Sequence, residues 1–391
     1  MHTDAEVLRP VRPVGTFAQA AWDIGVTIAG PAAADVDRDA RFPSETRAAL
    51  AEARLLSAMI PIESGGGGAS LAQMSGAVRA LATHCTSSAL VLAMHTNEIA
   101  QLVRFGQTPE LRELMQEISD HQLLVANANS EVGFGGDASQ SGCALQQTDA
   151  GLELRKHALA CSYGEHADLI AATARRSPQA EPGDQIYAIL RRPELTLRPT
   201  SEWDTIGLRG TCSAPLEIDA KVNPGLVYPI PFSEIAECGS LAAWLILLAS
   251  AWVGLAVAAA ARAHSYVHKA ARSTAMVPPS ALRLSELMIK LTEARAMLAS
   301  TLWSYERAEA SDELSSIQLV IGARSLKVAS STLALQIATD ALSICGIAGY
   351  RRSGPASLDR LLRDAHGSVV MVSNDRYMHA NASILSVRKE I

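Results

Sequence analysis

The sequence predicts an α+β fold built from three consecutive regions: an N-terminal helical domain (residues 1–122), a middle β domain (residues 123–235) and a C-terminal helical bundle (residues 236–391). Two observations predict this order. Apolar residues recur every three or four positions in the first and third regions, which is typical of helices, whereas the middle region consists of short apolar runs separated by turn residues. A chain of 391 residues is long enough for two or three domains with a large core.

The composition restricts the class of protein further. Charged residues make up 19% of the chain and the net charge is −6, with no block of like charges, so we expect no nucleic-acid partner. The six cysteines are scattered without C-x-x-C pairs, which is typical of reduced thiols in a cytoplasmic protein. The N-terminus carries acids and prolines instead of the basic patch and apolar run of an export signal. A cytoplasmic location is therefore expected.

The N-terminal region is predicted to be helical. Leucine recurs at helical spacing in residues 44–59, and apolar residues recur every three or four positions in residues 71–85 and 89–105. The four glycines at residues 65–68 are expected to form the loop between the first two helices.

The middle region has the pattern of a compact β domain. Clusters of Gly, Pro, Asp and Ser separate its apolar runs, as turns separate strands. The expected strands lie within residues 122–128, 151–161, 168–174, 185–192 and 216–222.

The C-terminal region is predicted to contain long helices, at residues 236–273, 280–308, 313–347 and 357–387. The first of them contains an uncharged run from Leu241 to Ala261, which is long enough to span a membrane. The run is rich in Ala and Gly, it is the only such segment, and no basic cluster flanks it. We therefore expect a buried helix at the centre of a bundle and no membrane partner.

Three local sequences carry a resemblance to a known family. Residues 203–211 read W-D-T-I-G-L-R-G-T, residues 345–350 read C-G-I-A-G-Y, and residues 361–365 read L-L-R-D-A. In this order, on this layout, they resemble the acyl-CoA dehydrogenase superfamily, including its flavin-dependent monooxygenase branch. The resemblance covers nearly the whole chain and implies flavin between the middle domain and a C-terminal four-helix bundle. It also implies a homodimer or homotetramer, because a second subunit usually completes the nucleotide half of the flavin site in this family.

The resemblance implies a first set of contacts to the flavin ring. The loop at residues 127–137 corresponds to the family's ring-contacting loop, and its glycines permit close approach of the backbone to a ligand. Asn129 and Ser130 in this loop can donate hydrogen bonds. A plain glycine-rich turn is the alternative interpretation.

Further contacts are implied in two other places. Ser162 is the hydroxyl candidate in the second ring-contacting stretch, although a shift of register gives that place to Cys161 or Ala160. The residues implied at the nucleotide half are Arg272, Gly346, Gly349 and Tyr350. Arg272 lacks the Phe and Gly that follow it in the family motif, so a solvated arginine is the alternative there. FAD is the expected cofactor, with FMN or a reduced flavin as alternatives.

The usual catalytic base of the family's dehydrogenases is absent. In those enzymes a Glu carboxylate removes an α-proton from an acyl thioester, and such a base must be ionised in a dry pocket. Counted from the R-D-A sequence, the corresponding residue is Val372, and the alternative family location on the first bundle helix corresponds to Trp244. Neither side chain can accept a proton.

Three hypotheses follow from this absence. In the first, Asp375 or His366 is a relocated base, and the protein oxidises an acyl or aminoacyl thioester bound to CoA or to an acyl carrier protein. In the second, the protein is a two-component monooxygenase acting on a small-molecule substrate, in which reduced flavin from a flavin reductase reacts with O2. His95 would then lie over the flavin, with a satisfied core histidine as the alternative. In the third, the fold persists as a non-catalytic binding subunit. No metal site is expected, because no H-E-x-x-H motif occurs.

Overall fold

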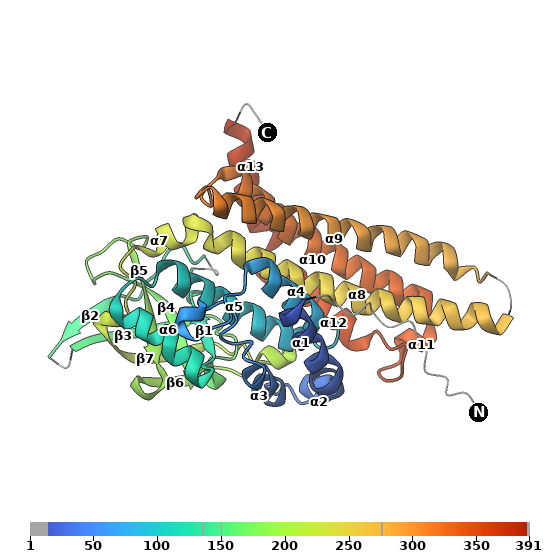
Figure 1. Cartoon of the computed structure of the whole chain (residues 1–391), viewed down its shortest axis with the longest axis horizontal. Coiled ribbons are helices and arrows are strands. Elements are labelled where there is room, and N and C mark those ends of the chain that lie inside the picture. The colour runs from blue at the N-terminus through green and yellow to red at the C-terminus, as the bar shows by residue number, and fades with distance from the viewer. Residues whose placement is uncertain (1–14, 135–136, 150, 275–276, 389–391) are drawn as a thin grey trace.

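The computed structural model describes residues 15–134, 137–149, 151–274 and 277–388. It shows the predicted order of a helical domain, a β domain and a helical bundle (Figure 1). The two sheets lie at one end of the molecule, and the bundle extends away from them as long, side-by-side helices.

The N-terminal domain packs against the first bundle helix. Its α-helices are α1 (Thr16–Ile24), α2 (Gly30–Arg38), α3 (Ser44–Glu52), α4 (Leu71–Ala82), α5 (Thr86–Phe105) and α6 (Pro109–His121), with a π-turn η1 (Gly25–Ala29) and a 3-10 turn η2 (Ile62–Ser64). The predicted helix at residues 44–59 ends early, at Glu52. Arg54 adopts a left-handed conformation (φ 55°), which an α-helix cannot continue through. Leu55 and Leu56 are then free to turn into the core.

The middle domain contains two sheets. Its strands are β1 (Val125–Ala128), β2 (Leu145–Thr148), β3 (Gly151–Ala158), β4 (Leu169–Arg175), β5 (Gln185–Arg191), β6 (Leu195–Pro199) and β7 (Leu216–Val222), with short 3-10 turns between some of them (Gly164–His166, Arg192–Glu194, Arg209–Thr211 and Pro224–Leu226). One sheet has the order β1-β4-β5 and the other has the order β2-β3-β7-β6. Strands β2 and β6 were not predicted, because they are short and carry exposed polar residues.

The bundle is built around one buried helix. Its elements are α7 (Phe232–Ile235), the π-turn η7 (Ala236–Ser240), α8 (Leu241–Thr274), α9 (Ser280–Ala310), α10 (Ile317–Cys345), α11 (Ile347–Tyr350), α12 (Asp359–Val370) and α13 (Asn374–Val387). Two helical segments, Phe232–Ser273 and Ile317–Cys345, are apolar and long enough to span a membrane by length and composition alone, whereas only one such segment was expected from the sequence. In the first, 89% of the most apolar window is buried inside the protein, as expected for a core helix.

The predicted helix at residues 357–387 is two helices. Helix α12 ends at Val370, and α13 begins at Asn374 and projects from the bundle (Figure 1). Val372 between them has φ 53°, a left-handed conformation that interrupts the helical hydrogen bonds. The residue at the position of the family's base is therefore the hinge of this break.

Candidate functional site

The residues implied at the flavin ring lie together at one edge of the middle domain. Asn129 and Ser130 follow β1, and Ser162 follows β3. The Ser130 hydroxyl donates to the Ala160 carbonyl over 3.2 Å, and the Leu159 amide donates to the Ser130 carbonyl over 3.2 Å. The structure thus brings these two loops into direct contact.

The hydroxyl groups of Ser130 and Ser162 at this edge both donate their hydrogen within the protein. Ser130 donates to a carbonyl, so it offers a ligand an acceptor and not the donor expected from the sequence. Ser162 pairs with Ser213 over 2.8 Å, and Ser213 pairs with Thr211 over 2.8 Å. Thr211 donates its hydrogen to the Leu208 carbonyl, so each preceding hydroxyl must donate along this chain. Ser162 is therefore also left as an acceptor.

Asn129 tests whether this edge fits a flavin. Its amide nitrogen donates to the Tyr187 hydroxyl over 3.4 Å, while its Oδ1 atom is buried without a hydrogen-bond partner in the described part of the chain. A buried unpaired oxygen calls for a donor, and the flavin ring system carries N–H groups. The three acceptors at this edge fit such a ring. Gly135 and Gly136 of the same loop lie outside the described residues.

The residues implied at the nucleotide half lie at the other end of the bundle. Arg272 is exposed near the end of α8, and Gly346 to Tyr350 follow the end of α10 (Figure 1). Helix α10 has 29 residues and is therefore about 43 Å long. The residues implied at the flavin ring and those implied at the nucleotide half therefore lie at opposite ends of the bundle of one chain.

The base candidates Asp375 and His366 are both exposed. His366 lies on α12, and Asp375 lies in the first turn of α13. Val372 between them packs partly against the main core, as does Trp244 on α8. In this single chain, neither family position carries a proton acceptor and neither alternative lies in a dry pocket.

His95 is fully buried on α5 and engaged at both ring nitrogens. Its Nδ1 accepts a hydrogen bond from the Val125 amide over 3.0 Å, which makes Nε2 the donor to the Leu56 carbonyl at 2.6 Å. Burial lowers the pKa of His95 to about 4, against the opposing effect of these bonds. The ring is therefore a neutral link between α5, β1 and the segment after α3.

Lys327 is a buried ionisable residue near the α12–α13 break. It was not identified as a candidate from the sequence. Its side chain is fully buried on α10, and Nζ donates to the Asn374 Oδ1 atom over 2.6 Å. Asn374 in turn donates to the Ser331 hydroxyl over 3.1 Å. Burial lowers the pKa of Lys327 to about 8. A lysine inside a helix with few other charged residues was the available signal.

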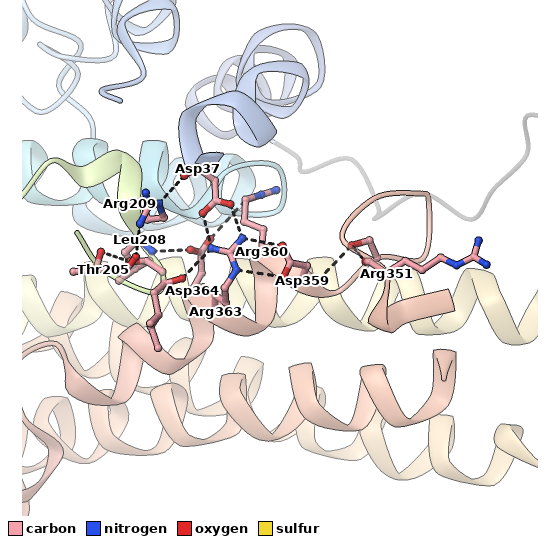
Figure 2. A network of polar contacts seen from close by, with 12 residues as sticks. Asp37, Thr205, Leu208, Arg209, Arg351, Asp359, Arg360, Arg363 and Asp364 are labelled. Carbon is pink, nitrogen blue, oxygen red and sulfur yellow. Dashed lines mark hydrogen bonds and ion pairs between the residues drawn. The ribbon is translucent and has the colours of Figure 1, made fainter. Parts of the chain in front are cut away.

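Two of the three motifs that carry the family resemblance, at residues 203–211 and 361–365, meet in one polar network (Figure 2). The Asp364 carboxylate accepts a hydrogen bond from the Leu208 amide over 2.7 Å, and Arg363 donates to the Ile206 carbonyl over 2.9 Å. Gly207 lies so close to α12 that a Cβ atom there would be 2.2 Å from the Arg363 carbonyl oxygen. The G-L-R-G turn and the R-D-A sequence therefore form a contact between the β domain and the bundle.

The sequence contains one pair of histidines with helical spacing that resembles a metal motif. His264 and His268 on α8 stack with ring centroids 6.3 Å apart. No group of three His, Cys, Asp or Glu side chains that could hold a metal occurs among the residues described.

A helical domain, a β domain and a long-helix bundle, joined through the L-R-D-A contact, define an acyl-CoA dehydrogenase-like oxidoreductase. The chain belongs to the acyl-CoA dehydrogenase family: the model of its N-terminal domain matches residues 17–115, and that of its C-terminal domain matches residues 241–371.

Individual relatives come from both branches of the family. The chain is 23% identical over 352 residues to cyclohex-1-ene-1-carbonyl-CoA dehydrogenase of Syntrophus aciditrophicus (strain SB), covering 88% of this chain and 82% of that protein. It is 25% identical over 341 residues to dibenzothiophene monooxygenase of Rhodococcus qingshengii, covering 80% and 81%. The structure of FMN-bound TdsC from Paenibacillus sp. A11-2 is similar with a TM-score of 0.82, at 19% identity and 96% and 98% coverage.

Proposed function

We propose that this protein is a reduced-flavin-dependent monooxygenase. The observation that carries the proposal is the apolar character of both family base positions, Val372 and Trp244, together with the exposure of Asp375 and His366. A dehydrogenase that removes an α-proton needs a base at the substrate, whereas oxygen transfer from a reduced flavin does not need a carboxylate. The similarity to dibenzothiophene monooxygenase supports the same branch.

The proposal assigns Asn129, Ser130 and Ser162 to the flavin ring. The unpaired Asn129 oxygen and the remaining acceptor capacity of the two serine hydroxyls would receive hydrogen bonds from ring N–H groups and fix the orientation of the ring. When bound, the reduced flavin supplies the electrons that activate O2. The assignment covers the ring that FMN and FAD share, and a flavin reductase is the partner that would supply the reduced form.

The proposal also requires two copies of the chain. Gly346, Gly349 and Tyr350 follow the end of α10, which is about 43 Å long, and Arg272 lies near the end of α8, so these residues would serve the nucleotide half of a flavin on another copy. Arg272 suits a phosphate because its planar guanidinium forms paired hydrogen bonds. A homodimer is the smallest assembly that completes the site.

The test compares the two branches directly. The purified protein is titrated anaerobically with FMN, FAD and their reduced forms, and binding is followed by absorbance and by thermal stability. We expect the protein to bind reduced flavin and to incorporate one oxygen atom from 18O2 into dibenzothiophene, used as a probe substrate. Bleaching of the bound oxidised flavin by butyryl-CoA without O2 would instead identify a dehydrogenase. Absence of any flavin binding would favour a non-catalytic subunit.

A further inference from the structure

A buried carboxyl group lies next to the proposed ring-facing edge. Glu98 on α5 is 2% exposed, and its Oε2 atom accepts a hydrogen bond from the Tyr187 hydroxyl over 2.5 Å. The Asn127 amide donates to Oε1 over 3.0 Å, and the amides of Asn97 and Gln101 donate at 3.3 to 3.5 Å. Donors from one helix and two strands thus surround this carboxyl group.

The network continues to Asn129. The Asn129 amide nitrogen donates to the Tyr187 oxygen over 3.4 Å, and Tyr187 donates its single hydrogen to Glu98. The donors therefore point in one direction, from Asn129 through Tyr187 to the carboxylate. The atom that Asn129 leaves unpaired is its acceptor, Oδ1.

Protonation of Glu98 reverses this chain. A neutral Glu98 has an O–H group that donates to the Tyr187 oxygen, so the Tyr187 hydrogen needs another acceptor. Among the described residues, Asn129 is the other side chain that hydrogen-bonds with the Tyr187 hydroxyl, and it can accept only through Oδ1. A half-turn of the Asn129 amide supplies that acceptor and leaves the amide nitrogen, a donor, as the unpaired group.

We propose that Glu98 is a positioning residue that determines, through Tyr187, whether Asn129 presents an acceptor or a donor to the flavin ring. The flavin part of this inference rests on the proposed function, which places the ring at Asn129. A reduced flavin ring has more N–H donors than an oxidised ring, so an ionised Glu98 favours the reduced form. A protonated Glu98 favours the oxidised form.

The groups around Glu98 leave it free to titrate alone near neutral pH. Burial raises its pKa to about 7, against the opposing hydrogen bonds from Tyr187, Asn127 and Asn97. Burial also raises the pKa values of the three neighbouring phenols well above 10, so these remain neutral; they are Tyr163, Tyr187 and Tyr228. His95, one turn earlier on α5, has a pKa of about 4 and is neutral as well.

The first experiment needs no flavin. The full-length protein is labelled with 15N in its asparagine side chains, and the Asn129 signal, identified with an Asn129→Ala variant, is followed from pH 5.5 to 8.5. We expect its shift to change with a midpoint near 7. Glu98→Gln should abolish this change, because its amide donates permanently to the Tyr187 oxygen. Tyr187→Phe should abolish it too, whereas Glu113→Gln, at an exposed position on α6, should not.

The second experiment measures the dissociation constants of oxidised and reduced FMN at both ends of this pH range. We expect the ratio of the oxidised to the reduced value to rise about fivefold with pH, as the gain of one hydrogen bond implies. The Glu98→Gln variant is the control, because any pH dependence of its ratio comes from ionisation of the flavin itself. Its ratio should lack the additional rise. A pH-independent Asn129 signal, or an equal rise in Glu98→Gln, would overturn the inference. If wild-type protein binds no flavin, the proposed function fails. The pH dependence of the Asn129 signal still tests whether the hydrogen-bond chain from Asn129 through Tyr187 to Glu98 reverses.

Discussion

Glu98 and Lys327 are buried ionisable side chains on helices whose sequences are otherwise largely apolar. The sequence placed both residues in helices. Their partners could not be predicted, because Glu98 meets Tyr187 from a strand 89 positions away, and Lys327 meets Asn374 from a helix 47 positions away. Asn129, Ser130 and Ser162 could be proposed from local motifs because each lies in a segment that resembles the family. Which of their atoms remain unpaired depends on contacts between separate loops.

Glu98 should make the stability of the protein depend on pH. Its pKa is raised from 4.5 to about 7, so the folded state holds a proton that the unfolded state has lost between these values. The contribution of Glu98 to the free energy of unfolding should therefore fall by about 3 kcal/mol as pH rises from about 4.5 to about 7. Glu98→Gln should lack this fall in urea titrations.

The comparison must be made between variants at each pH. His84 and His95 have pKa values lowered to about 4, so their contributions to the free energy of unfolding decrease as pH falls below 6.5. This change is opposite in sign to that of Glu98. The difference between wild type and Glu98→Gln isolates the carboxyl group. A difference that does not change between pH 5 and 8 would show that Glu98 does not titrate there.

At the scale of elements, the break between α12 and α13 is the main departure from the sequence pattern. Residues 357–387 have helical periodicity throughout, and periodicity reports the preference of a segment in isolation. The left-handed Val372 and the hydrogen bond from Lys327 to Asn374 fix a different direction for α13. A buried ammonium group that needs a partner is thus part of the reason that α13 starts where it does.

Asn374→Ala should destabilise the protein by removing the acceptor of this buried ammonium. We expect a loss of about 2 to 4 kcal/mol in urea unfolding, because an unpaired buried charge is costly. The double variant Lys327→Met with Asn374→Ala should recover most of this loss, since it removes the charge as well. Strictly additive effects of the two substitutions would contradict the role of the pair.

At the scale of the whole molecule, Arg363 joins all three regions. It donates to both Asp37 carboxylate oxygens from the N-terminal domain, to the Ile206 carbonyl from the middle domain, and to Asp359 on its own helix (Figure 2). Its side chain is 27% exposed and that of Asp37 is 14% exposed. These groups are shielded enough for their pairing to contribute to the stability of the domain arrangement.

Arg363→Met should therefore lower the free energy of unfolding by about 2 to 3 kcal/mol, because it leaves the Asp37 carboxylate without its partner. Arg38→Met is the matched control, since Arg38 also pairs with two aspartates but its side chain is 63% exposed. The control should leave the free energy of unfolding close to the wild-type value, because solvent screens an exposed ion pair. Equal losses in the two variants, measured by urea unfolding, would remove the special role of Arg363.

Two copies of the chain should complement each other in flavin binding. Asn129→Ala removes a ring contact and Arg272→Glu removes a nucleotide contact, so neither homodimer should bind flavin well. A heterodimer of the two variants, isolated with two affinity tags, should regain one of its two sites. Its flavin content should then be about half that of wild type by absorbance. A heterodimer that binds no more flavin than either homodimer would place the whole site in one chain.

The sequence by itself determined the three regions, their order, the buried helix α8 and the family, because periodicity and motifs are local properties of the chain. The chain length, which allows several domains, and the uncharged run at residues 241–261 were together sufficient to predict a large bundle core. Only the tertiary structure decided that Arg272 and Asn129 lie at opposite ends of the molecule, that α13 leaves the bundle, and that the buried Glu98 is linked to Asn129 through Tyr187. These features depend on contacts between segments far apart in sequence, and burial changes the chemistry of a side chain only once those segments have packed.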